Sequence, residues 1–225
     1  MNNNEYAKQN SLHGTTTVGI TCKDGIVLCA DTRAVLGSYY IAHRNVKKIS
    51  KIENHFALTV AGGVADAQNI IDQLKYNSSL YQLENKQKIP VQTAARLVSN
   101  VFFNARMFPY MAAIIVGGVD NNGPAIYNVD LFGTLTKEKF LSTGSGSPVA
   151  YGVLENEYSE NIEIKEGIGM AVRAVISAIR RNAGTGDGFD IITIDKTEFK
   201  DFSVEEKEKI LLEATGRKTI GWISK

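Results

Sequence analysis

A glycine followed by three threonines, Gly14-Thr15-Thr16-Thr17, begins the first strand-like segment of this 225-residue chain. A threonine hydroxyl is a weak nucleophile that needs a base, and the free amine of an N-terminal threonine can be that base. Cleavage after Gly14 would give Thr15 such an amine. An α-amino group titrates at about 7.7–8.0 and a lysine at about 10.4, so at pH 7 far more of the former is neutral.

The same segment has a second interpretation. Threonine is β-branched and common in strands, so the three threonines could simply begin a strand. The segment taken alone does not decide between a nucleophile and a strand start.

Other chemistries find less support. Residues 144–148 read GSGSP and nearly match the G-x-S-x-G elbow of serine hydrolases, but Pro148 occupies a glycine position and no histidine follows. The glycines of residues 184–188 lack the lysine of a P-loop. The three histidines have no metal-ligand spacing, so no metal site is predicted; they are His13, His43 and His55.

The composition indicates one soluble globular domain, with 44% hydrophobic and 22% charged residues. The net charge of +1 is spread without long runs, which argues against nucleic acid or an anionic membrane as a partner. Residues 1–14 have no apolar core of a signal peptide, and the apolar run at 111–116 is too short to span a bilayer. We therefore expect a cytoplasmic protein.

The two cysteines, Cys22 and Cys29, lie in apolar strand-like runs. A two-residue turn at Asp24-Gly25 would pair Cys22 with Val27, so the two thiols would not face each other. We expect two reduced thiols in the core.

Hydrophobic periodicity predicts blocks of strands and helices. Strands at 18–22, 26–30, 46–52 and 55–61 come first, and their closeness in sequence predicts one antiparallel sheet. Helices at 64–76 and after Pro90, strands at 111–119, 124–130, 133–136 and 140–143, helices at 148–158 and 167–181, and a strand at 189–194 follow. A capping box beginning at Ser203 starts a last helix that ends at Gly216. This order predicts an α+β fold, a four-layer αββα sandwich of two antiparallel sheets flanked by helices.

Several stretches together resemble the β-subunits of the proteasome core particle, archaeal ones most of all. They are TTTVGITCKDGIVLCADTRA, YIAHRNVKKI, TVAGGVADAQ, STGSGSPVAYGVLE and RNAGTGDGFDIITI, in the family's order across about residues 15–195. The resemblance implies an Ntn-hydrolase fold and a threonine protease whose Thr15 is the N-terminal nucleophile. It also implies that residues 1–14 are a propeptide, removed by autocleavage at Gly14-Thr15, and that 15–225 form a single catalytic domain. Thr16 and Thr17 are then expected to be ordinary strand residues.

The resemblance carries an acidic and a basic partner onto this chain. Asp31 matches the acidic residue, and Lys48 matches the catalytic lysine in preference to Lys47, because that choice keeps the family's spacing. Local geometry does not explain the pairing: an ideal register through Asp24-Gly25 would set Asp31 opposite Val18 and on the other face from Thr15, so a twist or a bulge is required.

Further site residues follow by position. Gly62 matches the residue whose N–H stabilises the oxyanion, and Ser145 matches the serine near the threonine amine. Ala34, Val60 and Val64 match the specificity pocket, whose apolar lining predicts cleavage after apolar residues.

Two positions depart from the family pattern. Asn182 and Thr185 stand where the family has aspartate and serine, so Asn182 lacks the usual negative charge and could lower activity. Val35 replaces a common threonine at a substrate-binding position that acts mainly through its backbone.

The resemblance also implies partners. These are homologous β-subunits in heptameric rings, rings of α-subunits, a regulatory ATPase and unfolded polypeptide substrates, with no cofactor. Two alternatives remain open: a structural β-subunit of little activity paired with an active paralogue, motivated by Asn182, and the simpler bacterial ATP-dependent peptidase of the same superfamily.

Overall fold

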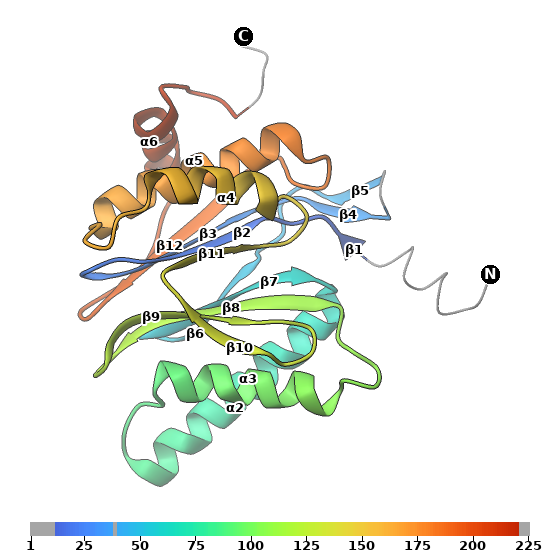
Figure 1. Ribbon diagram of the computed structural model, residues 1–225, viewed down its shortest axis with the longest axis vertical. Helices are drawn as coiled ribbons and strands as arrows, with labels where there is room; N and C mark the ends of the chain where they lie inside the picture. Colours follow the sequence, from blue (N-terminus) through green and yellow to red (C-terminus); the bar gives the residue numbers. More distant parts are fainter. Residues whose placement is uncertain (1–11, 38–39, 221–225) are drawn as a thin grey trace, which may run out of the picture.

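Two five-stranded antiparallel sheets face each other, with helices on their outer sides (Figure 1). The computed structural model describes residues 12–37 and 40–220. Helices α4, α5 and α6 cover one sheet, and α2 and α3 cover the other. The predicted four-layer αββα sandwich is confirmed.

The first sheet has the order β11-β2-β3-β12-β13, and all its neighbours are antiparallel. Its strands are β2 (Thr17–Thr21), β3 (Gly25–Asp31), β11 (Phe140–Thr143), β12 (Phe189–Asp195) and β13 (Phe199–Asp201). The second has the order β10-β9-β8-β7-β6. Its strands are β6 (Ile49–Glu53), β7 (Phe56–Gly62), β8 (Ala112–Asp120), β9 (Gly123–Val129) and β10 (Leu135–Glu138).

The first four predicted strands do not form one sheet, so that prediction is wrong. β2 and β3 belong to the first sheet, whereas β6 and β7 belong to the second. Every residue of β3, and all of β7 but its last, is buried, because each strand is covered on one face by helices and on the other by the opposite sheet. Sequence patterns cannot assign such doubly buried strands to a particular sheet.

The hairpin between β2 and β3 turns one residue earlier than predicted. Cys22 N–H donates to the carbonyl of Gly25 at 2.8 Å, so the two loop residues are Lys23 and Asp24. Gly25 instead belongs to β3, where a Cβ would lie 2.3 Å from the carbonyl oxygen of Ile194 on β12. Glycine is therefore required here for close strand contact, and the predicted pairing of Cys22 with Val27 is wrong.

A small third sheet lies beside the sandwich at the end where the chain begins, and the sequence did not predict it (Figure 1). Its order is β1-β4-β5, and the strands are β1 (Leu12–His13), β4 (Ala34–Leu36) and β5 (Tyr40–His43). The backbone of β1 pairs with β4, with His13 opposite Val35. The segment before Thr15 is therefore an added strand on β4.

The helices match the predicted ones with shifted ends. They are α2 (Val64–Asn85), α3 (Val91–Asn104), α4 (Ser147–Glu157), α5 (Ile164–Arg181) and α6 (Val204–Thr215). α6 confirms the capping prediction: Ser203 Oγ accepts from Glu206 N–H at 3.3 Å, the Glu206 carboxylate accepts from Ser203 N–H at 2.8 Å, and Gly216 ends the helix at φ 66°. No helix in the described ranges is long and apolar enough to cross a membrane.

The layer between the sheets is apolar except for a line of threonine hydroxyls. Ile115, Ile126 and Leu28 are among its fully buried side chains. Thr59 Oγ1 on β7 donates to Thr17 Oγ1 on β2 at 3.0 Å, and Thr17 Oγ1 lies 2.7 Å from Thr143 Oγ1 on β11. Thr17 therefore links the two sheets, beyond the ordinary strand role predicted for it.

Both cysteine thiols are free and buried in the layer beneath α4 and α5. Burial, with Asp24 and Glu166 nearby, raises the pKa of Cys22 to about 12, and burial raises the pKa of Cys29 as well. Thiols of this kind carry little thiolate and react slowly.

His55, buried at the start of β7, makes stability depend on pH. Its Nε2 lies 2.8 Å from the carbonyl oxygen of Ile89 and must carry the proton of that bond. Burial lowers the pKa of His55 below its usual value of 6.5. The folded chain thus favours the neutral ring, and the stabilisation is present above pH 6.5 and lost as the pH falls below it.

We therefore expect the free energy of unfolding of the full-length chain to fall between pH 7.5 and pH 5.5. The variant His55→Gln, which keeps a donor for Ile89 but does not titrate, should lose less over the same range. Urea unfolding of both chains at the two pH values measures this. An equal loss in both chains would assign the pH dependence to other groups.

Candidate active site at the Gly14-Thr15 junction

The Thr15 hydroxyl lies directly beside the peptide bond that precedes it. Thr15 is buried, and its Oγ1 donates to the carbonyl oxygen of Gly14 at 2.6 Å. Gly14 has φ +100°, and a Cβ there would lie 2.4 Å from Val35 Cγ2 and 2.5 Å from the carbonyl oxygen of Gly184. Only glycine fits this turn between β1 and β2.

Lys48 also contacts the Gly14 carbonyl oxygen. Its Nζ donates to the Gly14 carbonyl oxygen at 3.2 Å and to Asp31 Oδ1 at 2.7 Å. The Lys48 side chain is 6% exposed and that of Asp31 is fully buried. Lys47 points elsewhere, to Asp201 at the surface. The structure thus places Lys48, not Lys47, at the junction, as the spacing predicted.

The Asp31 carboxylate is held by the backbone around it. Its Oδ1 accepts from Thr16 N–H at 2.8 Å, and its Oδ2 accepts from Gly186 N–H at 2.9 Å and from Arg33 N–H at 3.2 Å. The carboxylate makes no hydrogen bond to the Thr15 side chain; Lys48 links it to the Gly14 carbonyl oxygen.

The register of the hairpin explains this position. Because the loop consists of Lys23 and Asp24, Val18 pairs with Cys29 instead of Asp31. Asp31 follows on and its N–H donates to the carbonyl of Thr16 at 3.1 Å. The displaced turn sets Asp31 opposite Thr16 instead of Val18, but these two positions share a strand face, so Asp31 stays on the other face from Thr15 by regular alternation. Lys48 is what connects Asp31 to the Gly14-Thr15 junction.

Burial dominates the titration of this pair. It raises the pKa of Asp31, opposed by Lys48 and by the N–H groups of Thr16 and Gly186. It lowers the pKa of Lys48, opposed by Asp31 and reinforced by the charge of Arg33. A lysine with a lowered pKa exchanges its proton more readily near neutral pH.

A second, uncharged set of groups lies on the other side of Thr15. Thr15 N–H donates to Ser145 Oγ at 3.5 Å, and Ser145 Oγ donates to Asn182 Oδ1 at 2.9 Å. Thr185 Oγ1 also donates to Asn182 Oδ1, at 2.9 Å, and lies 2.8 Å from Thr16 Oγ1. Since the Thr185 proton goes to Asn182, Thr16 must donate to Thr185. Thr16 is thus part of this network.

The amide of Asn182 uses both its ends. Its Oδ1 additionally accepts from Gly184 N–H at 3.0 Å, and its Nδ2 donates to the carbonyl oxygen of Ser145 at 3.1 Å. A carboxylate at this position would have no donor for that carbonyl.

A pocket of about 270 Å³ opens beside Thr15. Of the predicted lining residues, Ala34 and Val60 border it, together with Thr15 and with Gly62, the predicted oxyanion residue. Val64 begins α2, and its side chain lies outside what the structure describes. Val35 is near Gly14 and pairs with His13 through its backbone, but does not border the pocket.

Sequence reasoning missed other residues of this lining. They are Val46, Lys47, Ser50, Ala67, Gln68 and Ile71. Ala67 and Ile71 follow the apolar helical spacing of α2, which is a usable signal. Nothing in the sequence indicated Ser50 or Gln68, which are uncharged polar residues of the lining besides Thr15.

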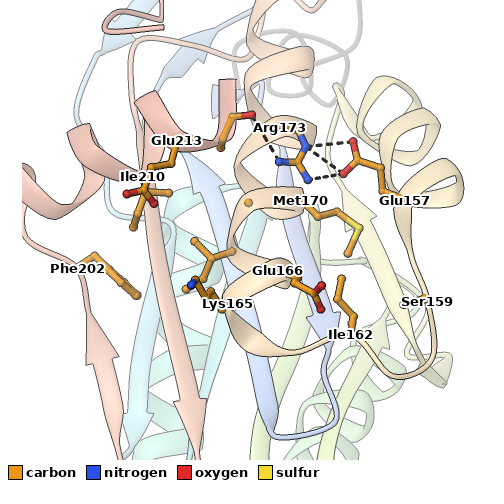
Figure 2. Close-up of a pocket in the computed structure, with 13 residues that line it drawn as sticks. Glu157, Ser159, Ile162, Lys165, Glu166, Met170, Arg173, Phe202, Ile210 and Glu213 are labelled. Atoms are coloured by element: carbon orange, nitrogen blue, oxygen red, sulfur yellow. Dashed lines mark hydrogen bonds and ion pairs between the residues drawn. The ribbon is translucent and has the colours of Figure 1, made fainter. Parts of the chain in front are cut away.

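Another cavity, of about 610 Å³, lies at the outer helical layer (Figure 2). Figure 2 shows Arg173 facing Glu157 across it, and the guanidinium binds both carboxylate oxygens at 2.6–3.1 Å. Its principal charged pair is therefore satisfied within the chain. Across the described ranges, no cluster of three or more potential metal-ligating residues occurs.

A four-layer αββα sandwich with a threonine at the start of an inner strand is the architecture of the N-terminal-nucleophile hydrolases. Comparison with known proteins gives the family. The proteasome subunit family matches residues 11–194. The chain belongs to this family, as the resemblance in its sequence predicted.

The similar proteins are archaeal. Proteasome subunit beta 2 of Nitrosopumilus maritimus is 51% identical over 211 residues, which cover 94% of this chain and 99% of that protein. Proteasome subunit beta of Methanothermobacter thermautotrophicus is 46% identical over 202 residues, which cover 89% and 96%. Proteasome subunit beta of Archaeoglobus profundus is 45% identical over 199 residues, which cover 88% and 92%.

The backbone conformation at Gly62 is constrained, and substitutions at Gly62 and Gly63 can test this constraint. Its φ is +134°, and a Cβ would lie 2.0 Å from the Met111 carbonyl oxygen, whereas Gly63 has φ −66° and would meet only the Asp66 side chain, at 3.2 Å. We expect Gly62→Ala to lower the free energy of unfolding by at least about 2 kcal/mol, and Gly63→Ala by under about 1 kcal/mol. Urea unfolding of the unchanged chain and of the two variants measures these losses. Equal losses would show that the backbone at Gly62 is not constrained as described.

Proposed function

We propose that Thr15 is the catalytic nucleophile of this chain and that autocatalytic cleavage of the Gly14-Thr15 bond frees it. The chain is a β-subunit of the proteasome core particle, a threonine-type endopeptidase. One observation supports the proposal above all: the Gly14 carbonyl oxygen receives both the Thr15 hydroxyl, at 2.6 Å, and the Lys48 ammonium, at 3.2 Å.

The proposed cleavage begins with attack of Thr15 Oγ on the carbonyl carbon of Gly14. The five-membered ring that forms places negative charge on the Gly14 oxygen, beside Lys48. Collapse of the ring breaks the bond between Gly14 carbon and Thr15 nitrogen. The proton that leaves Thr15 Oγ is taken up by this nitrogen, which becomes an amine, while Gly14 becomes an ester of the Thr15 hydroxyl. Water then hydrolyses the ester, leaving Gly14 as a carboxylate and Thr15 with a free amine and hydroxyl.

In the cleaved enzyme, the Thr15 amine accepts the hydroxyl proton as Oγ attacks a substrate carbonyl. An acyl-enzyme ester results, and water hydrolyses it. Lys48, which Asp31 keeps in position, provides a positive charge beside the reacting groups. The Gly62 N–H stabilises the oxyanion. Ser145, next to the Thr15 nitrogen at 3.5 Å, keeps the amine in place, supported by Asn182 and Thr185.

Residues 1–14 are proposed to act as a mask, and 15–225 as the single catalytic domain. The mask withholds the amine, because Thr15 nitrogen is in a peptide bond until cleavage. The backbone of β1 also occupies the edge of β4. An extended substrate could use the same edge by strand addition, which accounts for a role of Val35 through its backbone.

The pocket supports a preference for cleavage after apolar residues. Ala34, Val46, Val60 and Ile71 are aliphatic, and no acidic side chain borders the cavity. A basic residue of a substrate would find no carboxylate there, whereas an apolar one would be removed from water. Lys47 and Lys48 also border the cavity, but each is paired with an aspartate of the chain, Asp201 and Asp31 respectively.

The chain assembles with other proteasome subunits, as its family membership implies. We further propose heptameric β-rings stacked with rings of α-subunits, a regulatory ATPase that delivers unfolded polypeptides, and a cytoplasmic location. The chemistry described above requires no cofactor or metal.

A structural subunit of little activity is the alternative, because Asn182 lacks the charge of the family's aspartate. The contacts of Asn182 support an active site instead: its amide has four partners, and one of them requires the N–H donor. The following experiment separates the two.

The precursor is co-expressed with a matching α-subunit, and assembled particles are analysed by intact mass and with an apolar fluorogenic peptide. We expect the wild-type chain to begin at Thr15 and to hydrolyse the peptide. Thr15→Ser, which keeps the hydroxyl, should still be cleaved, whereas Thr15→Ala should keep its leader and lose activity to background. Hydrolysis that persists in Thr15→Ala, or a wild-type chain that keeps its leader and is inactive, would contradict the proposal.

Two neighbouring lysines give a matched comparison. Lys48→Gln removes the cation from the Gly14 carbonyl, and we expect cleavage and peptide hydrolysis to fall by at least about a hundredfold. Lys47→Gln breaks an exposed pair with Asp201 and alters one residue at the pocket, but leaves Lys48 on the Gly14 carbonyl, so the rate of leader removal should change by under about twofold. The rate of leader removal and the peptide assay are measured in assembled particles. Similar losses in both variants would reject the assignment of Lys48.

A further inference from the structure

The loop that follows α5, residues 182–188, supplies much of the site. Thr185 contributes its hydroxyl to the uncharged network, and Gly186 contributes an N–H to Asp31 Oδ2 at 2.9 Å. The backbone of Gly184 packs against Gly14, with 2.5 Å between the Gly184 oxygen and the place of a Cβ on Gly14. The position of this loop therefore determines the surroundings of both Asp31 and the Gly14 carbonyl.

The two ends of the loop are anchored by other groups. Asn182 lies at the end of α5, with its N–H on the Ala178 carbonyl at 2.8 Å. At the far end, Gly188 N–H donates to Thr32 Oγ1 at 3.0 Å and Thr32 N–H donates to the Gly188 carbonyl at 3.1 Å. Between these ends, beside the hydrogen bonds of Thr185 and Gly186, an ion pair forms a further anchor.

Arg33 and Asp187 form that anchor. Arg33 Nε donates to Asp187 Oδ2 at 2.9 Å and Nη2 to Asp187 Oδ1 at 3.1 Å, a bidentate pair whose side chains are only 20% and 19% exposed. Arg33 Nη1 also donates to the Ala183 carbonyl at 3.1 Å. The guanidinium thus binds the loop at two points.

The guanidinium also lies flat against the loop backbone. A Cβ on Gly186 would be 2.2 Å from Arg33 Cζ, so the close contact requires glycine. Asp187 itself has φ +64°, a conformation uncommon for residues other than glycine. The ion pair holds Asp187 in this conformation, directly after the residue whose N–H binds Asp31.

We infer that Arg33 and Asp187 are positioning residues: their bidentate ion pair keeps the Gly186 N–H on the Asp31 carboxylate and thereby keeps Lys48 at the Gly14 carbonyl. This inference rests on the proposed function for its effect on catalysis. Neither side chain is recorded in contact with Thr15 or Gly14, so the pair acts through Asp31.

This role requires the planar guanidinium of arginine, whose N–H donors have a fixed forked geometry. A lysine at position 33 would keep the positive charge but could not bind both oxygens of Asp187 and the Ala183 carbonyl in one plane. Arg44 provides the matched control: it binds the same Asp187 Oδ1 at 2.8 Å, but through one bond from a side chain that is 71% exposed.

The test has an arm that does not depend on activity. Arg33→Lys, Asp187→Asn and Arg44→Gln are each combined with Thr15→Ala in assembled particles, and amide hydrogen exchange is measured on peptides covering residues 182–189. Asparagine tolerates the positive φ of position 187, so Asp187→Asn removes the ion pair without adding strain. We expect about tenfold faster exchange in this loop for Arg33→Lys and Asp187→Asn, and no change for Arg44→Gln.

The second arm uses particles that retain Thr15. Arg33→Lys and Asp187→Asn should each lower kcat for an apolar peptide by about ten- to a hundredfold with KM within about twofold, because the loop does not border the pocket. The double variant should be no slower than the slower single variant, since the two residues act as one unit. Arg44→Gln should keep wild-type kcat.

The outcomes separate the inference from the proposed function. Unchanged exchange of the loop in Arg33→Lys, or losses in kcat that multiply in the double variant, would overturn the positioning role even if Thr15-dependent hydrolysis is established. If the particles show no Thr15-dependent hydrolysis while the loop exchanges faster in both variants, the proposed function fails and the structural role of the pair stands.

Discussion

The buried ion pair of Lys48 and Asp31 is the interaction on which the arrangement of the site depends. Removing two charges from water costs several kcal/mol per ion, so such a pair is tolerated only when further hydrogen bonds satisfy it. Here the carboxylate receives three backbone N–H groups besides the ammonium. To supply them, the ends of β3, the start of β2 and the loop after α5 must converge. The hydrogen bonds that one buried carboxylate requires therefore bring distant parts of the chain together.

The groups around Thr15 form one charged set and one uncharged set. On one side, Lys48 and Asp31 are charged and buried; on the other, Ser145 and Asn182 form a neutral network with Thr185. Asn182 fits the uncharged set because its amide both accepts and donates.

Local signals in the sequence predicted the elements but not their assembly. The capping residues Ser203 and Gly216 defined α6 correctly, because caps act within one turn. The Asp24-Gly25 pair predicted a turn that is displaced by one residue. The reason is that Gly25 is required for close contact with β12, which lies far along the chain. The placement of β6 and β7 in the same sheet as β8 was likewise beyond reach, since a doubly buried strand such as β7 carries no mark of its partner.

The candidate site was predicted by resemblance more than by chemistry derived from the residues. Composition and spacing made Thr15 conceivable, but the positions of Lys48, Gly62 and Ser145 came from family stretches. Arg33 and Asp187 lie within the family stretches, but nothing in the sequence pairs them, because they are 154 positions apart.

Three identical residues in a row pose a problem of alignment that chemistry alone does not solve. Thr15, Thr16 and Thr17 carry the same hydroxyl, yet their hydroxyls meet a peptide carbonyl, Thr185 and the opposite sheet, respectively. Sliding β2 by one residue would still leave a threonine at two of the three places. What forbids the slide is the flanking residues: Gly14 alone accepts the turn at φ +100°, and Gly19 fits against Ile115, where a Cβ would be 3.0 Å away. The choice among three equivalent hydroxyls is therefore made by two glycines that have no hydroxyl.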